Sequence, residues 1–188
     1  MNFFSAFQSE VFRPLVTLII PGAIALSSWL VGLFWHYPKL LALVSQNHSE
    51  TGWILVLTTI CAGTVLEEFG THLESTFDER ADKKTNGQHM ANWYAYLRSA
   101  FLSDPIGRRY VRSVVLRLKF QFGVFFGSIS AALGILWLFY LGMPCRLGLV
   151  LLLISLAFGC WALLESISTH ELLAENRAEL LKEIRVVR

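Results

Sequence analysis

The chain has 188 residues, of which 54% are hydrophobic and 16% are charged, and its formal net charge at pH 7 is +2. An average globular chain carries about 25% charged residues, so this composition excludes an ordinary soluble domain. Runs of about 20 apolar residues are typical of membrane-spanning helices, and the sequence contains four such runs.

The first element in chain order is the amino-terminal segment, residues 1–13. Four apolar side chains recur in it at helical spacing: Phe3, Phe4, Phe7 and Val11. The pattern predicts a short amphipathic helix that lies in the inner membrane interface. A frayed terminus is the alternative.

The first transmembrane hairpin is predicted over residues 14–66, with spans at 14–37 and 52–66. Backbone amides in hydrocarbon have no water to bond, so each span must be helical. Pro21-Gly22 interrupts the first span, and a proline removes one backbone hydrogen bond from a helix. The pair is therefore a candidate hinge, or else a packing bend that neighbouring helices tolerate.

A polar segment, residues 67–119, comes next and is too long for a simple turn. We expect the second span to continue as a helix towards Arg80, and Asn86-Gly87 indicates a turn after it. Apolar residues at helical spacing then predict a helix over residues 90–102. Ser103-Asp104-Pro105 predicts the start of a further helix that leads into the third span.

The second transmembrane hairpin is predicted over residues 120–164, with spans at 120–143 and 147–164. Gly123 and Gly127 form a GxxxG pattern, which is typical of close helix approach within a subunit or between subunits.

The tail, residues 165–188, is predicted to continue the fourth span as an amphipathic helix. Together these elements indicate an all-α membrane protein. We expect a four-transmembrane-helix bundle with a helical cytoplasmic loop and tail.

A short phrase occurs twice where an apolar run meets charge: Leu66-Glu67-Glu68-Phe69-Gly70-Thr71-His72 and Leu164-Glu165-Ser166-Ile167-Ser168-Thr169-His170. Both copies contain Leu-Glu, three further residues and Thr-His. Repeated hairpins are a common origin of polytopic membrane proteins. The repeat therefore suggests two duplicated hairpins, with coincidence as the alternative.

The distribution of basic residues predicts the orientation. Fourteen of the sixteen lysine and arginine residues fall in the amino terminus, residues 67–119 and the tail, whereas Lys39 and Arg146 fall in the other connections. The positive-inside rule then places both termini and the long loop in the cytoplasm. We predict a multi-pass protein of a bacterial-type inner membrane.

The candidate pore or ion-pair layer consists of ionisable residues at the cytoplasmic ends of the second and fourth spans: Glu67, Glu68, His72, Glu165 and His170. Ionisable groups at membrane depth are costly and suggest a function. One interpretation is an ion-pair network with basic residues of neighbouring spans, and another is an acidic ring for cations in an oligomeric pore. Metal binding is disfavoured, because the Glu-to-His spacing of five residues corresponds to about 140° around a helix.

The candidate contact for anionic lipid or phosphate is a basic cluster before the third span: Arg108, Arg109, Arg112, Arg117 and Lys119. Each basic residue near an anionic membrane surface contributes about 1 kcal/mol of attraction. The same charges attract phosphorylated ligands and nucleic acids, but no glycine-rich phosphate loop or nucleic-acid motif accompanies them. We therefore expect anionic lipids of the cytoplasmic leaflet as partners and no nucleic acid.

The sequence shows no recognisable catalytic, cofactor-binding or metal-binding motif, and its three cysteines lack metal or disulfide spacing. We therefore expect no enzyme. The first functional hypothesis is an oligomeric inner-membrane anchor or scaffold that recruits a cytosolic protein through its loop and carboxyl-terminal helix. The alternative is a pore- or channel-forming effector with a Glu67/Glu165 layer at its cytoplasmic mouth.

In layout, the chain looks like the small four-span membrane subunits of bacterial anti-phage defence systems, in which a membrane component works with a cytosolic partner. The resemblance concerns architecture, and a shared architecture does not imply a shared activity.

Overall fold

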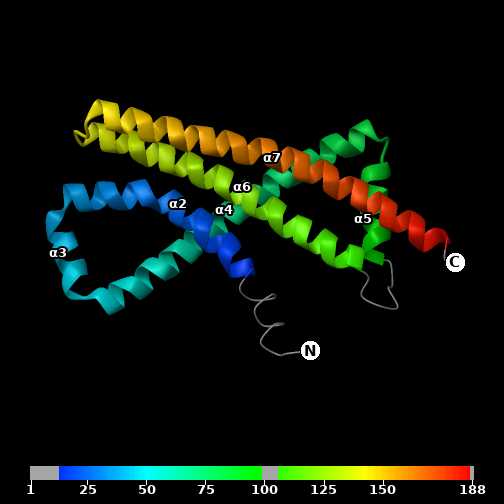
Figure 1. Cartoon of the computed structure of the whole chain (residues 1–188), viewed down its shortest axis with the longest axis horizontal. Helices are drawn as coiled ribbons and strands as arrows, with labels where there is room; N and C mark the ends of the chain where they lie inside the picture. Colours follow the sequence, from blue (N-terminus) through cyan, green and yellow to red (C-terminus); the bar gives the residue numbers. More distant parts are fainter. Residues whose placement is uncertain (1–12, 99–105, 187–188) are drawn as a thin grey trace.

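The computed structural model describes residues 13–98 and 106–186, and within them the chain forms six helices and no strand. The helices are α2 (Arg13–His36), α3 (Pro38–Gln46), α4 (His48–Lys84), α5 (Gln88–Arg98), α6 (Ile106–Tyr140) and α7 (Cys145–Val186) (Figure 1). The predicted all-α class is therefore confirmed. The predicted interfacial helix, apart from Arg13, and the predicted helix start at residues 103–105 lie outside the described residues.

Four helices of the described part of the chain, α2, α4, α6 and α7, are long and apolar enough to cross a membrane. The fold therefore has the character of a membrane protein. The third predicted span extends to residue 143, whereas α6 ends at Tyr140. A turn follows it in which Gly142 has φ +92°, a conformation that glycine adopts without strain and that ends a helix.

The connection between α2 and α4 contains a helix that the sequence analysis did not predict. Helix α3 begins with Pro38 at its first position, where the missing N–H costs nothing. Within α3, which the structure describes completely, no residue is buried. Figure 1 shows α2 and α4 diverging from a crossing point, with α3 joining their far ends.

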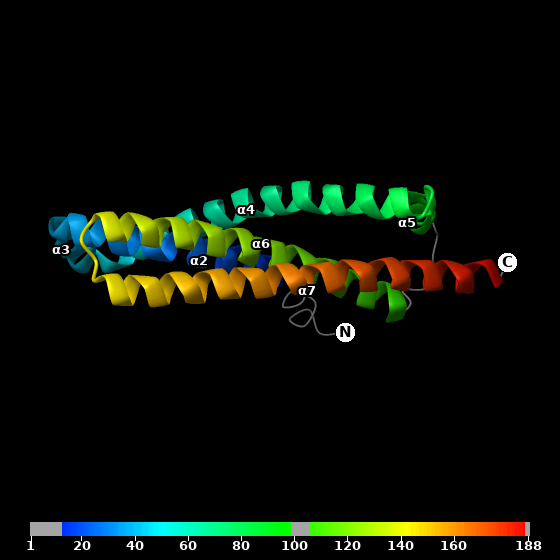
Figure 2. The ribbon, with the colours of Figure 1, turned by 90° about the horizontal axis from the view of Figure 1, so that it is seen from above.

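Helix α6 is the central element and packs against α2, α4 and α7. Figure 2 shows α4 along one edge of the molecule and α7 along the other, with α6 crossing α7 obliquely. Two buried or half-buried hydroxyls connect the helices: Ser28 of α2 donates to the carbonyl of Ala131 at 2.8 Å, and Ser155 of α7 donates to the carbonyl of Ser128 at 2.9 Å. Such hydrogen bonds between helices are a common means of association in lipid.

Glycines allow α2 and α4 to approach closely where they cross. A Cβ atom on Gly22 would collide with the carbonyl oxygen of Thr59, and one on Gly63 would collide with the carbonyl oxygen of Leu18. The main chains of α2 and α4 therefore touch where they cross, which small residues permit.

The GxxxG pattern of α6 contacts the proline of α2. A Cβ atom on Gly123 would lie 2.9 Å from Pro21 Cγ, and one on Gly127 would lie 2.8 Å from the Pro21 carbonyl oxygen. The pattern is therefore used within the chain. Pro21 and Gly22 lie inside the continuous helix α2, at its contacts with α6 and α4.

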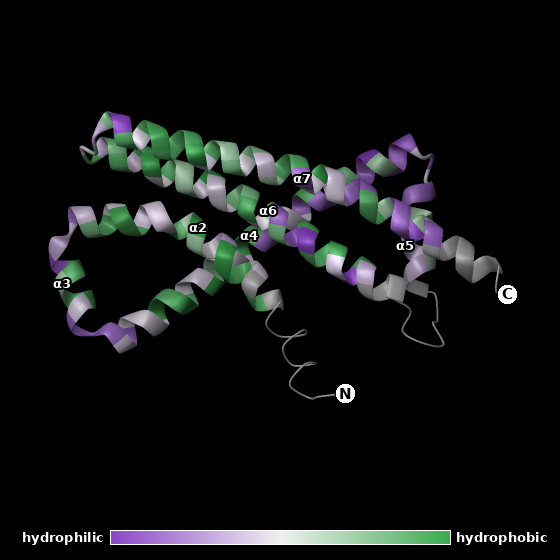
Figure 3. Cartoon of the chain, in the orientation of Figure 1, coloured by the Kyte–Doolittle hydropathy of each residue, from purple (hydrophilic) through white to green (hydrophobic). Residues whose placement is uncertain are grey.

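Three helices are longer than a membrane requires. Helix α7 has 42 residues, which corresponds to about 63 Å, whereas the hydrocarbon core is about 30 Å thick. Figure 3 shows hydrophilic residues gathered at the end of the molecule that contains α5, and smaller hydrophilic groups around α3 and at the turn between α6 and α7. Hydrophobic residues prevail between the two ends. We call residues 67–98, 106–119 and 165–186 the polar extension.

A hydrophobic core lies within the polar extension and reaches into the apolar part of α6 at Phe122. Five buried residues of α6 and α7 form the core: Val111, Val114, Leu118, Phe122 and Leu173. Side chains of α4 and α5 pack against it, among them Phe77 and Tyr96. The extension is therefore a packed unit, continuous with the apolar helices.

Candidate functional site

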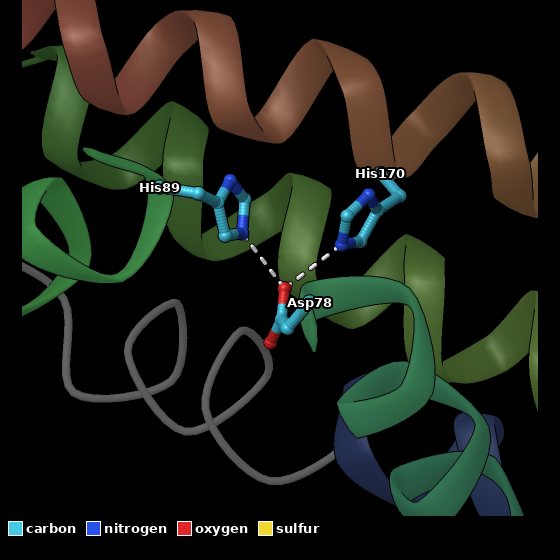
Figure 4. Close-up of side chains that lie close together, drawn as sticks. All are labelled: Asp78, His89 and His170. Carbon is cyan, nitrogen blue, oxygen red and sulfur yellow. Dashed lines mark hydrogen bonds and ion pairs between the residues drawn. The ribbon is translucent and has the colours of Figure 1, made fainter. Parts of the chain in front are cut away.

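One carboxylate and two imidazoles from three helices meet inside the polar extension. Asp78 lies on α4, His89 at the start of α5 and His170 on α7 (Figure 4). A three-residue turn separates α4 from α5, and in it Asn86 and Gly87 have φ of 50° and 82°. Asn and Gly adopt this left-handed backbone conformation most readily. The two residues reverse the chain, so α5 folds back and His89 comes to lie beside α4.

The three side chains, which we call the Asp–His–His cluster, share one oxygen atom. His89 Nε2 and His170 Nε2 each lie 2.9 Å from Asp78 Oδ1. An ionised carboxylate only accepts hydrogen bonds, so both rings donate to it. The two rings stack with their centroids 5.6 Å apart. The histidine side chains are 7% and 9% exposed and that of Asp78 is 26% exposed, so the cluster lies mostly inside the protein.

The electrostatics of the cluster depend on burial and on these hydrogen bonds. Asp78 and Glu74 lie on the polar part of α4, beyond its apolar stretch. Burial alone would raise the pKa of Asp78, but hydrogen bonds from His170 and His89 hold that pKa below its usual range. The pKa of Glu74 is raised, mainly by burial and to a smaller extent by the negative charge of Asp78.

A buried arginine borders the cluster. Arg177 of α7 is 6% exposed, and its guanidinium carbon lies 3.9 Å from the centroid of the Trp93 ring of α5. Its Nε atom has no hydrogen-bond partner among the described residues. The cation–π contact connects α5 to α7, and the positive charge of Arg177 faces Asp78 and Glu74.

The glutamates of the repeated phrase both pair with α6. Lys119 Nζ lies 2.7 Å from Glu67 Oε1, and Arg117 forms an ion pair with Glu165. Helix α6 therefore contributes one basic side chain to an ion pair with α4 and one to an ion pair with α7. These are the contacts that the ion-pair interpretation of the sequence requires.

The other members of the repeated phrase differ in their surroundings. Leu66 is 8% exposed and Leu164 is 68% exposed. His72 is exposed on α4, as is Glu68, whereas His170 is buried in the cluster. Corresponding positions of the two copies are therefore used differently.

The basic candidates are divided among several environments. Arg117 and Lys119 are engaged by glutamates. Arg112 is exposed and has an interaction of its own. Arg108 and Arg109 belong to the first turn of α6, but their side chains lie outside the described residues.

A hollow of about 530 Å³ lies between the apolar parts of α2, α6 and α7. Its lining is almost entirely apolar, with serine hydroxyls as the polar exception. Such a lining suits hydrocarbon and offers no acid, base or metal ligand.

The sequence analysis identified His170 but missed Asp78 and His89. It also expected no metal site, whereas these three residues provide three ligand atoms that lie close together. The turn at Asn86-Gly87 was a usable signal, because a chain that reverses there returns His89 to the end of α4. The approach of α7 had no such local signal.

No protein-family model matches this chain, and no curated protein and no solved structure match it either.

Proposed function

We propose that the protein is a membrane anchor, a four-helix bundle whose polar extension recruits a cytosolic protein partner. The observation that carries the proposal is that the extension has its own hydrophobic core and is continuous with the apolar helices. A partner bound to such an extension is held at a fixed distance from the membrane. A flexible tail would not fix that distance.

The proposed orientation places the extension in the cytoplasm. The lysine and arginine residues concentrate in the segments that form it, in accordance with the positive-inside rule. Aromatic side chains at the opposite end of the apolar region are exposed: Trp35, Tyr37, Trp53 and Tyr140. Aromatic rings favour the membrane–water interface, so these residues support an outer boundary near α3.

The proposed docking face lies on the part of α7 within the extension. Ile167, Glu171, Leu172 and Glu175 are exposed there, and Glu171 and Glu175 are one helical turn apart on one face. Their charge and apolar neighbours suit a partner with a basic, partly apolar surface.

Site-specific crosslinking in cells tests the proposal. A photoreactive residue at Ser168, which is exposed on this face, should crosslink to one cytosolic protein. Combining Glu171→Lys, Leu172→Ser and Glu175→Lys should abolish that crosslink and leave membrane insertion intact. Glu79→Lys reverses an exposed charge on α4 and serves as the matched control. A crosslink that survives the triple substitution would reject this docking face.

We also propose that the protein forms homo-oligomers and contacts anionic lipids of a bacterial-type inner membrane. The apolar windows of α4 and α7 are each only 17% buried within the chain, so lipid or another subunit must cover them. Crosslinking between exposed cysteines introduced on α4 separates these two possibilities, because only a second subunit gives a covalent dimer.

The pore alternative is distinguished by ion flux. The pairing of Glu67 with Lys119 and of Glu165 with Arg117 favours the anchor, because each glutamate charge is offset by a cation. Voltage-dye measurements should show a steady membrane potential on expression. Rapid depolarisation that Glu67→Gln with Glu165→Gln abolishes would instead support an acidic ring.

A further inference from the structure

We propose that Asp78, His89 and His170 bind one divalent first-row transition-metal ion of the Zn²⁺ class. Their ligand atoms all lie within 4.8 Å of one another, and Figure 4 shows both imidazole nitrogens directed at the Asp78 carboxylate. This site goes beyond the proposed anchoring function, and it does not depend on the identity of the partner.

All three ligand atoms have to shift to accept the ion. Zn²⁺ binds imidazole nitrogen at about 2.0–2.1 Å and carboxylate oxygen at about 2.0–2.2 Å. In a tetrahedral arrangement such ligands lie about 3.3 Å apart, whereas the Nε2–Oδ1 separations are 2.9 Å. The carboxylate therefore has to move outward by about 0.4 Å. The two imidazole ligand atoms, which lie within 4.8 Å of each other, also have to approach to about 3.3 Å, which rotation of the rings about their side-chain bonds has to provide.

The ligand chemistry suits zinc. Two neutral imidazoles and one carboxylate leave a fourth position for water, as in catalytic zinc sites. Both Nε2 atoms carry a proton when they donate to Asp78, so on metal binding each ring moves its proton to Nδ1 through solvent. The Nε2 lone pairs then coordinate the ion, and no oxidant or reductant is required.

The surrounding residues hold the ligands in place. The two rings are stacked on each other, and His170 also contacts the edge of Phe77 with centroids 5.9 Å apart. Glu74, one helical turn before Asp78, is a further carboxyl group close enough to the cluster for its charge to be coupled to that of Asp78. Arg177 places one positive charge beside the cluster, which opposes a bound cation. A bound ion would fix α5 to α4 and α7.

Zinc titration of the full-length protein in detergent micelles tests the site. The protein is first stripped with a chelator, and Zn²⁺ is then added in competition with a fluorescent zinc indicator. We expect one ion per chain. His89→Gln and His170→Gln should each weaken binding at least tenfold, because the amide can still donate to Asp78 but is a poor metal ligand. His72→Gln alters an exposed histidine of α4 and should bind as the unaltered chain does.

Two further measurements keep the result decisive. Helical circular dichroism and gel filtration establish whether each variant is folded. If a histidine variant does not fold, zinc binding is measured with Asp78→Asn in its place. Co²⁺ bound at the site should give a visible absorption spectrum that His89→Gln changes and His72→Gln does not. Failure of the unaltered chain to bind zinc would overturn the proposal. The proposal would also be overturned if His89→Gln and His170→Gln bound zinc as tightly as the unaltered chain. The cluster would then be a hydrogen-bonded contact only.

Discussion

His170 Nε2 of α7 lies 2.9 Å from Asp78 Oδ1 of α4, although the two residues are 92 positions apart in the sequence. The contact joins α4 and α7, which lie along opposite edges of the molecule in Figure 2. The same carboxylate oxygen accepts a hydrogen bond from His89, so a single side chain connects α4, α5 and α7. The polar extension thus depends on Asp78 for its internal connections.

Removing the Asp78 carboxylate should destabilise the fold in the absence of metal. Asp78→Ala leaves two buried imidazole N–H groups without their acceptor, and each such group costs about 1–3 kcal/mol. Thermal unfolding in detergent with a chelator present should therefore occur at a lower temperature. Glu79→Ala removes an exposed carboxylate from the neighbouring position and should change the midpoint little. Equal midpoints for the two variants would contradict the prediction.

Enlarging Gly63 should disrupt the crossing of α2 and α4. A Cβ atom there collides with the main chain of Leu18, and overpacking of this kind costs about 1–3 kcal/mol or more. Gly63→Leu should lower the unfolding midpoint and the yield of folded protein. Gly52 lies on the same helix with nothing within 4 Å of an added Cβ. Gly52→Ala should be tolerated and slightly stabilising, by about 0.5–1 kcal/mol. A tolerated leucine at position 63 would show that the crossing is loose.

Exchanging Lys119 and Glu67 should restore the ion pair, and with it the stability that reversing either charge alone removes. Lys119→Glu places two negative groups together, and so it should destabilise the contact of α6 with α4. Adding Glu67→Lys recreates an ion pair of opposite direction. Because exposed pairs contribute about 0–1 kcal/mol, the coupling should be small but measurable in a double-mutant cycle of unfolding midpoints. Purely additive effects would mean that the pair contributes nothing.

Truncating Trp93 should loosen α5 from α7. Helix α5 has 11 residues, and isolated helices of that length are marginal in water, so packing must hold it. Trp93→Leu removes the cation–π contact with Arg177, which contributes about 0.5–2 kcal/mol. Backbone amides of α5 should then exchange hydrogen faster. Tyr94→Leu changes an exposed neighbour and should leave exchange unchanged, and equal protection in both variants would exclude a role for Trp93.

The helical hairpin at the end of α4 illustrates how far local signals reach. Asn86-Gly87 predicted the turn, and the two residues adopt the left-handed conformations that define it. Local chemistry decides this feature, because few other residue types tolerate positive φ. The pattern did not predict α3, because a nine-residue helix with a proline start resembles a loop in sequence.

By itself, the sequence determined the all-helical fold and the four long apolar helices. The reason is that a backbone in hydrocarbon must bond to itself, and long apolar runs identify where that occurs. The sequence also showed that charged residues lie where those apolar runs end. Only the tertiary structure decided which ionisable residues meet. His72 and His170 end the same phrase, yet one is exposed and the other is buried against Asp78. The two phrases share four of their seven residues, including the Thr-His pair itself, and this shared local sequence gives no sign of the difference. It arises from how helices distant in the chain pack around α6.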